Sequence, residues 1–145
     1  MVTLGAVRDF ARNAHYGQVD KMGRDYFTAH LTPIAERLAP LGTDAEMAGL
    51  LHDILEDTDV TPSQLLTLGV PSNVVDAVIA VTKVPGESYD ATIERAAANP
   101  LGRQVKLADN AQNLADNAAL AEVDPQTASR LKAKYERARQ RLLSG

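Results

Sequence analysis

The chain has 145 residues, a formal net charge of −4 and no cysteine. This length suits one domain with its own hydrophobic core and leaves no room for a second catalytic domain of similar size. The negative charge argues against general affinity for nucleic acid or for an anionic membrane surface. The absence of cysteine excludes disulfides, a thiolate zinc site and a cysteine nucleophile.

The beginning of the chain gives no targeting signal. Residues 1–5 contain neither a basic region nor a long apolar run, so we expect no signal peptide. No stretch approaches the length of a membrane span. We therefore expect a cytoplasmic protein that binds a small molecule and has no nucleic-acid or membrane partner. The sequence does not predict its oligomeric state.

Apolar residues recur at steps of three and four along nearly the whole chain, which is the period of amphipathic helices. Leu4 to Ala14 is the first such pattern, and Gly17 is a typical stop. A second helix is expected around residues 26–39, ending near Pro40 and Gly42. Thus the first third of the chain predicts helices and no strand.

The third helix carries the most informative residues. Thr43 and Glu46 have the spacing of a capping box and predict its start, ahead of His52 and Asp53. Further helices are expected over residues 61–69, 74–81, 88–98, 101–119 and 124–143. These patterns predict an all-α bundle of about seven or eight helices.

The last predicted helix is strongly basic. Its cations are Arg130, Lys132, Lys134, Arg137, Arg139 and Arg141. One interpretation is a solvated helix with favourable charge near its C-terminus. The alternative is that some of these cations face the phosphates of a substrate. A buried stripe of Leu131, Tyr135, Ala138 and Leu142 is expected on the other side.

Four polar residues follow an apolar run in the third helix. His52, Asp53, Glu56 and Asp57 are spaced so that they would share one helix face. Three carboxylates on one face repel each other unless a cation or a substrate lies there. Imidazole nitrogen and carboxylate oxygen are suitable ligands for a divalent metal, and the acidic pair could accept protons from water. A solvated acidic face is the alternative.

Three other segments accompany this motif. They are Ala14-His15-Tyr16-Gly17-Gln18 followed by Lys21 to Tyr26, then His30, and finally Val105-Lys106-Leu107-Ala108-Asp109 with Asn113. In this order and spacing they resemble the HD-domain metal-dependent phosphohydrolases. Among these, the chain is most similar to the hydrolase domain of RelA/SpoT proteins and to stand-alone small alarmone hydrolases. The resemblance implies a single HD domain over residues 1–145 that hydrolyses a nucleotide and does not synthesise one.

The resemblance implies four metal ligands: His30, His52, Asp53 and Asp109. Such a set suits one manganese ion, which the family favours, or iron, and it also accommodates zinc or magnesium. In the family, the ligand histidine typically lies three residues after the tyrosine that matches Tyr26. Here the gap is four residues, so a small bulge or a shifted helix start must absorb the extra one.

The resemblance also implies roles around the metal. Glu56 and Asp57 would act on the attacking water, and the sequence leaves open which of them is the base. Lys21 and Asn113 match residues that contact the nucleotide, while His15 is expected to support the structure. The implied substrate is guanosine 3′,5′-bis(diphosphate) or the corresponding pentaphosphate, which would lose its 3′-pyrophosphate.

Some positions depart from the family. Asp20, Asn110 and Ala115 stand where arginines are usual, and the remaining nearby cations are Arg24 and Lys106. Fewer cations weaken the prediction of a highly phosphorylated substrate more than they weaken the reaction type. The alternatives are a phosphatase for another small nucleotide and an HD module that senses a nucleotide without cleaving it.

Overall fold

The computed structural model describes residues 2–144, so both ends of the expected 1–145 domain lie outside the described residues. Its helices are α1 (Leu4–Ala14), η1 (Phe27–Leu31), α2 (Thr32–Leu38), η2 (Ala39–Leu41), α3 (Thr43–Leu51), α4 (Ile54–Asp57), α5 (Pro62–Leu68), α6 (Ser72–Val81), α7 (Tyr89–Ala98), α8 (Pro100–Leu120) and α9 (Pro125–Leu143). Extended pairing within residues 2–144 is limited to one isolated bridge between Val19 and Asp25. The all-α prediction is confirmed.

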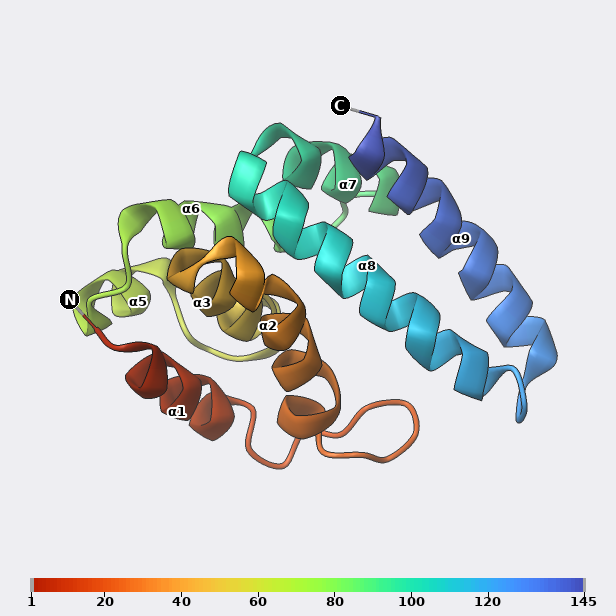
Figure 1. Ribbon diagram of the computed structural model, residues 1–145, viewed down its shortest axis with the longest axis horizontal. Coiled ribbons are helices and arrows are strands. Elements are labelled where there is room, and N and C mark those ends of the chain that lie inside the picture. Colours follow the sequence, from red (N-terminus) through yellow and green to blue (C-terminus); the bar gives the residue numbers. More distant parts are fainter. Residues whose placement is uncertain (1, 145) are drawn as a thin grey trace.

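The long helices α8 and α9 lie side by side at one edge of the molecule (Figure 1). Helix α3 lies in the centre and contacts α1, α2, α6 and α8. Buried side chains from these helices form the main core, whereas α7 and α9 contribute to a smaller cluster around Ile93 and Leu142. None of the described helices combines the length and apolar character that crossing a membrane requires.

Helices α2 and α3 approach each other closely at Gly49. A Cβ atom at this position would lie 2.7 Å from Leu38 Cδ1 and 3.3 Å from Ala35 Cα. Glycine therefore permits a close helix contact at which a Cβ atom would require Leu38 Cδ1 and the Ala35 backbone to shift. This contact matters for the site, because His52, the C-cap of α3, follows three residues later.

Local signals predicted several helix ends correctly. Thr61 caps α5 by accepting from Gln64 N, and the Gln64 side chain completes the capping box. Gly69 ends this helix in the left-handed region, with φ of 105°. The capping box expected at Thr43 is wrong. Gly42 is the N-cap there, without a side-chain cap, and the Glu46 carboxylate instead lies 3.2 Å from Arg8 Nη2.

The continuous helix expected through residues 52–57 is also wrong. Helix α3 ends at Leu51, and Asp53 has φ of −104° and ψ of −1°, a bridge conformation that interrupts the helix before α4. The acidic residues after the break therefore do not extend the face that carries His52. This is why the bundle has one more short helix than the periodicity suggested.

The chain adopts a π-helical turn, η1, just after Tyr26. A π turn holds one more residue than an α turn, and such turns are frequent at functional sites. It accommodates the extra residue between Tyr26 and His30 without disturbing α2, which follows directly. The structure thus contains the small bulge that the sequence spacing required.

Candidate active site

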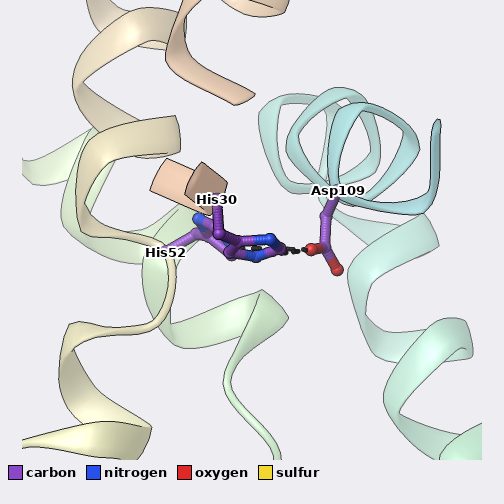
Figure 2. Close-up of side chains that lie close together, drawn as sticks. All are labelled: His30, His52 and Asp109. Atoms are coloured by element: carbon purple, nitrogen blue, oxygen red, sulfur yellow. Dashed lines mark ion pairs between the residues drawn. The ribbon is translucent and has the colours of Figure 1, made fainter. Parts of the chain in front are cut away.

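Three buried side chains from distant parts of the chain meet at one point. His30 comes from η1, His52 from the end of α3 and Asp109 from α8 (Figure 2). Their ligand atoms all lie within 4.8 Å of one another. The Oδ1 atom of Asp109 is 3.2 Å from His30 Nε2 and 3.5 Å from His52 Nε2. A cluster of this kind is a possible metal site.

Asp53 joins this cluster from the break between α3 and α4. Its Oδ2 atom lies 3.1 Å from His52 Nε2 and 3.4 Å from His30 Nε2. The same oxygen accepts a hydrogen bond from the Tyr26 hydroxyl. The structure therefore brings together the four side chains that the sequence suggested as ligands.

The imidazole of His52 is oriented by its other nitrogen. Nδ1 lies 2.7 Å from the carbonyl oxygen of Gly49, and a carbonyl oxygen can only accept, so Nδ1 carries the proton. Nε2 is buried and has no hydrogen-bond partner among the described residues. Its lone pair faces the oxygens of Asp53 and Asp109, and facing acceptors require a proton or a cation between them. The donor set thus fits a divalent metal ion.

The electrostatics of the cluster favour positive charge. Burial lowers the pKa of His30, but Asp109 and Asp53 outweigh it and raise that pKa to about 9. Burial raises the pKa of Asp109, but Lys106 and the two imidazoles hold it well below its usual range. The carboxylates that favour protons on the imidazoles would equally favour a metal ion in place of those protons, because metal binding displaces them.

A cavity of about 480 Å³ opens beside this cluster, which is within the usual range for a small-molecule site. It is lined by Val19, Asp20, Lys21, Met22, Arg24, Tyr26, His30, Asp53, Glu56, Lys106, Asp109, Asn113, Asp116, Asn117, Leu120, Leu131 and Tyr135. Lys21 and Asn113, which the sequence suggested as nucleotide contacts, therefore lie on the wall of the same cavity as the ligands.

The two acidic residues of α4 point to different places. Glu56 lines the main cavity, and its Oε1 atom accepts a hydrogen bond of 3.1 Å from Lys83 N. Asp57 lines a second hollow, and its Oδ2 atom accepts a hydrogen bond of 3.0 Å from Gln18 Nε2. Of the predicted pair, Glu56 is the one that lines the same cavity as His30, Asp53 and Asp109.

His15 lies behind the site rather than in it. The side chain is buried, and its Nδ1 atom lies 2.7 Å from Gln18 Oε1. Gln18 in turn donates to Asp57. His15 is therefore connected to Asp57 through Gln18 and does not line the cavity. Gln18 belongs to the segment Ala14-His15-Tyr16-Gly17-Gln18, but the local sequence does not predict its contact with Asp57.

Two lysines, Lys21 and Lys106, line the cavity, and Lys134 lies over the Tyr89 ring, 4.1 Å from its centroid. The Lys106 Nζ atom lies 3.1 Å from Asp109 Oδ2. Burial lowers the pKa of Lys134 on α9, and the positive charges of Lys21, Lys106 and Lys83 lower it further. These lysines are therefore close enough to repel one another, and an anion between them would relieve that repulsion. Elsewhere on α9, Arg137 and Arg141 pair with acidic residues of α7.

The loop that carries Lys21 is held by Asp20. The Oδ1 atom of Asp20 accepts hydrogen bonds of 2.9 Å from Met22 N and Arg24 N, and Oδ2 lies 2.8 Å from Arg24 Nε. The Arg24 guanidinium lies 3.5 Å from Asp116 Oδ1 and lines the cavity. Asp20 is thus part of the loop structure, and an arginine still lies beside it.

The other departures from the family lie away from the cavity. Asn110 is buried, and its amide donates to the Tyr135 carbonyl oxygen at 2.8 Å. Ala115 is exposed on α8. Tyr135 itself lines the cavity with Leu131, although the sequence predicted both only as part of a buried stripe. A helical period does not reveal which part of a buried stripe borders a cavity.

Several known proteins are similar to this chain in sequence. No family model matches the chain. A guanosine-3′,5′-bis(diphosphate) 3′-pyrophosphohydrolase from Aquifex aeolicus is 34% identical over 116 residues, covering 73% of this chain and 16% of that protein. The corresponding probable enzyme from Synechocystis is 37% identical over 92 residues, covering 62% of this chain and 12% of that protein. This chain therefore spans a small part of the curated relatives.

A solved structure covers nearly all of the chain. It is described as a metazoan ortholog of SpoT that hydrolyzes ppGpp, and it matches with a TM-score of 0.81 at 22% identity, over 97% of this chain and 85% of that chain. The fold is thus that of an all-helical HD hydrolase domain. Within this class, the chain is similar to the RelA/SpoT-type hydrolase domain, as the four motifs predicted.

Proposed function

We propose that this domain is a metal-dependent phosphohydrolase that removes the 3′-pyrophosphate of guanosine 3′,5′-bis(diphosphate). The observation that carries the proposal is the meeting of His30, His52, Asp53 and Asp109 beside a cavity whose wall includes Lys21, Arg24 and Lys106. The names of the similar proteins support the same reaction. A nucleotide substrate also agrees with the cytoplasmic location that we expect.

The two imidazoles and the two carboxylates would hold one divalent ion. Nitrogen and oxygen donors without sulfur suit manganese or iron, and we propose manganese because of the family resemblance. A bound ion of this kind supplies Lewis-acid chemistry: it polarises a phosphoryl oxygen and makes water a better nucleophile at neutral pH. The remaining steps belong to side chains of the cavity.

We assign proton transfer to Glu56. Its carboxylate lines the cavity, and Lys83 N holds one of its oxygens at 3.1 Å. From this place it can accept a proton from the water that attacks phosphorus. Asp57, which Gln18 holds outside the main cavity, would support Glu56 from the adjacent position without touching the substrate.

The cations of the cavity would hold the phosphates. Lys21 and Arg24 come from one loop, and Lys106 comes from α8. Phosphoryl transfer needs positive charge on the transferred and leaving groups, and these side chains supply it from several directions. Asn113, with an amide that both donates and accepts, would contact the nucleoside.

A second candidate is a phosphatase for another small nucleotide. The carboxylates of Asp20 and Asp116 also lie on the cavity wall and oppose the positive charges of Lys21, Arg24 and Lys106. A substrate with fewer phosphates would tolerate this better than an alarmone would. Both candidates use the same metal and the same Glu56, so they differ in substrate and not in reaction type.

A substrate panel tests the proposal. The protein is freed of metal, supplied with Mn²⁺ and incubated separately with guanosine 3′,5′-bis(diphosphate), GTP, GDP and a simple phosphate monoester. Pyrophosphate and GDP from the first substrate are expected. Faster cleavage of another nucleotide would favour the second candidate. Binding of the alarmone without any cleavage would indicate a sensing module.

A further inference from the structure

We propose that Tyr26 is a positioning residue of the metal centre: its hydroxyl group orients the Asp53 carboxylate toward the two imidazoles and thereby strengthens cation binding. The hydroxyl donates to Asp53 Oδ2, the same oxygen that lies 3.1 Å from His52 Nε2. This inference rests on the metal site of the proposed function. It assigns a role to a side chain that is not itself a ligand.

Asp53 needs such support more than the other three ligands do. It lies at the break between α3 and α4, where no regular helix fixes its side-chain direction. Its side chain is 21% exposed, compared with 3% for His52 and 9% for Asp109. Packing therefore restrains the Asp53 carboxylate less, and a hydrogen bond from another element restricts the orientations that remain.

The Tyr26 ring is well placed to hold its hydroxyl still. Its centroid lies 4.9 Å from the His30 ring and 5.6 Å from the His15 ring. Tyr26 is also the residue from which the π turn starts, and this turn carries His30. One turn thus supplies a ligand directly and orients a second ligand through a hydrogen bond. A change in this turn would move both.

The hydroxyl uses one lone pair of Asp53 Oδ2 and leaves the other toward the imidazole nitrogens. Hydrogen-bonded partners of this kind orient ligands in metal sites, and their loss typically lowers metal affinity about 10–100-fold. Tyr26 also lines the cavity, so a contact with the substrate is the rival interpretation. A substrate contact would change the Michaelis constant and leave metal affinity unaltered.

The test is the affinity of Tyr26→Phe for Mn²⁺, measured by calorimetry without any substrate. The substitution removes one oxygen and keeps the ring between His15 and His30. The matched control is Tyr135→Phe, whose ring lines the same cavity from α9. We expect the dissociation constant to rise about 10–100-fold in Tyr26→Phe and to stay at the wild-type value in Tyr135→Phe.

A second measurement separates weaker metal binding from a general loss of stability in the variant. The rise in unfolding temperature on adding Mn²⁺ is measured for each protein relative to its own metal-free form. A ligand that binds only the folded state stabilises it by RT ln(1 + [L]/Kd), so weaker binding gives a smaller rise at the same Mn²⁺ concentration. A smaller rise in Tyr26→Phe supports the inference. Equal affinity and an equal rise overturn it, whether or not the wild type cleaves the alarmone. If Tyr26→Phe binds Mn²⁺ more weakly but the wild type does not hydrolyse the alarmone, only the proposed function is rejected.

Discussion

The Nδ1 atom of His52 lies 2.7 Å from the carbonyl oxygen of Gly49, within the close contact between α2 and α3. This hydrogen bond fixes the imidazole so that its unpaired Nε2 faces Asp109 and Asp53. The packing of two helices and the direction of a proposed ligand therefore depend on one glycine. A substitution at Gly49 should therefore change both the free energy of unfolding and the metal affinity.

Gly49→Ala is expected to lower the free energy of unfolding by about 1–3 kcal/mol, because its Cβ would overlap Leu38 and approach the Ala35 backbone. Metal affinity should fall as well, since His52 moves with the carbonyl of residue 49. Urea unfolding and Mn²⁺ titration measure both. Gly5→Ala is the control: it lies in α1 with nothing within 4 Å of its Cβ. An equally stable Gly49→Ala protein would contradict the packing argument.

The two acidic residues of α4 should differ in their effect on turnover. Glu56→Gln removes the carboxylate that lines the main cavity and should lower kcat about 100-fold or more, with the metal retained. Asp57→Asn should lower kcat less, because Gln18 holds that side chain at a different hollow. Steady-state kinetics with parallel metal analysis measure this. A larger loss in Asp57→Asn would reverse the assignment of the base.

The loop around Lys21 gives a prediction about substrate binding. Lys21→Ala should raise KM about fivefold, which corresponds to about 1 kcal/mol at a partly screened position. Asp20→Arg should also raise KM, because it removes the acceptor for Met22 N, Arg24 N and Arg24 Nε. Charge alone would predict the opposite, because an added cation on the cavity wall attracts phosphates.

The charge-reversed pair Asp20→Arg with Arg24→Asp separates the two effects. It can restore an ion pair across the turn while keeping the net charge of the loop. We expect its KM to lie nearer the wild type than that of Asp20→Arg alone, with kcat little changed. A single Asp20→Arg variant that binds the alarmone more tightly than the wild type would show that charge outweighs loop structure.

Glu87 gives a pH-dependent prediction away from the metal. Hydrogen bonds from Arg95, the Thr92 hydroxyl and Val84 N lower its pKa from 4.5 to about 2. A pKa lowered on folding stabilises the protein above the unfolded value, and this contribution is lost as the pH falls through the folded value. Glu87→Gln should therefore unfold more easily than the wild type near neutral pH. The difference should shrink between pH 4.5 and about 2.

Thermal unfolding at several pH values measures this effect. Glu122→Gln, in the exposed turn after α8, is the control and should follow the wild type throughout. The Glu87 network also bears on the site, because Arg95 donates to Thr82 O, beside the Lys83 backbone that holds Glu56. A pH-independent difference between Glu87→Gln and the wild type would contradict the linkage.

Most helices could be predicted because their ends depend on local hydrogen bonds. Thr61 with Gln64 and Asp124 before Pro125 cap helices through neighbours three residues away. Thr43 failed because the capping partner, Glu46, pairs instead with Arg8 from another helix. A tertiary contact of this kind leaves no trace in the local pattern.

The sequence could predict which residues lie at the site, but not where each side chain points. The motifs suggested four ligand residues that the structure brings together, and the one-residue excess before His30 corresponds to the π turn η1. Helical spacing wrongly extended α3 past Leu51 and therefore aligned Asp57 with His52. The direction of Asp57 depends on Gln18, which lies 39 residues earlier in the chain.

The central claim is that His30, His52, Asp53 and Asp109 bind one metal ion that hydrolysis of the alarmone requires. The most direct measurement is pyrophosphate release from guanosine 3′,5′-bis(diphosphate) by metal-free protein during titration with Mn²⁺, with Asp109→Asn in parallel. The account predicts activity that rises to a plateau at about one ion per chain, as the single four-ligand set implies, and no activity in Asp109→Asn. Metal-independent release, or equal release by Asp109→Asn, would contradict it.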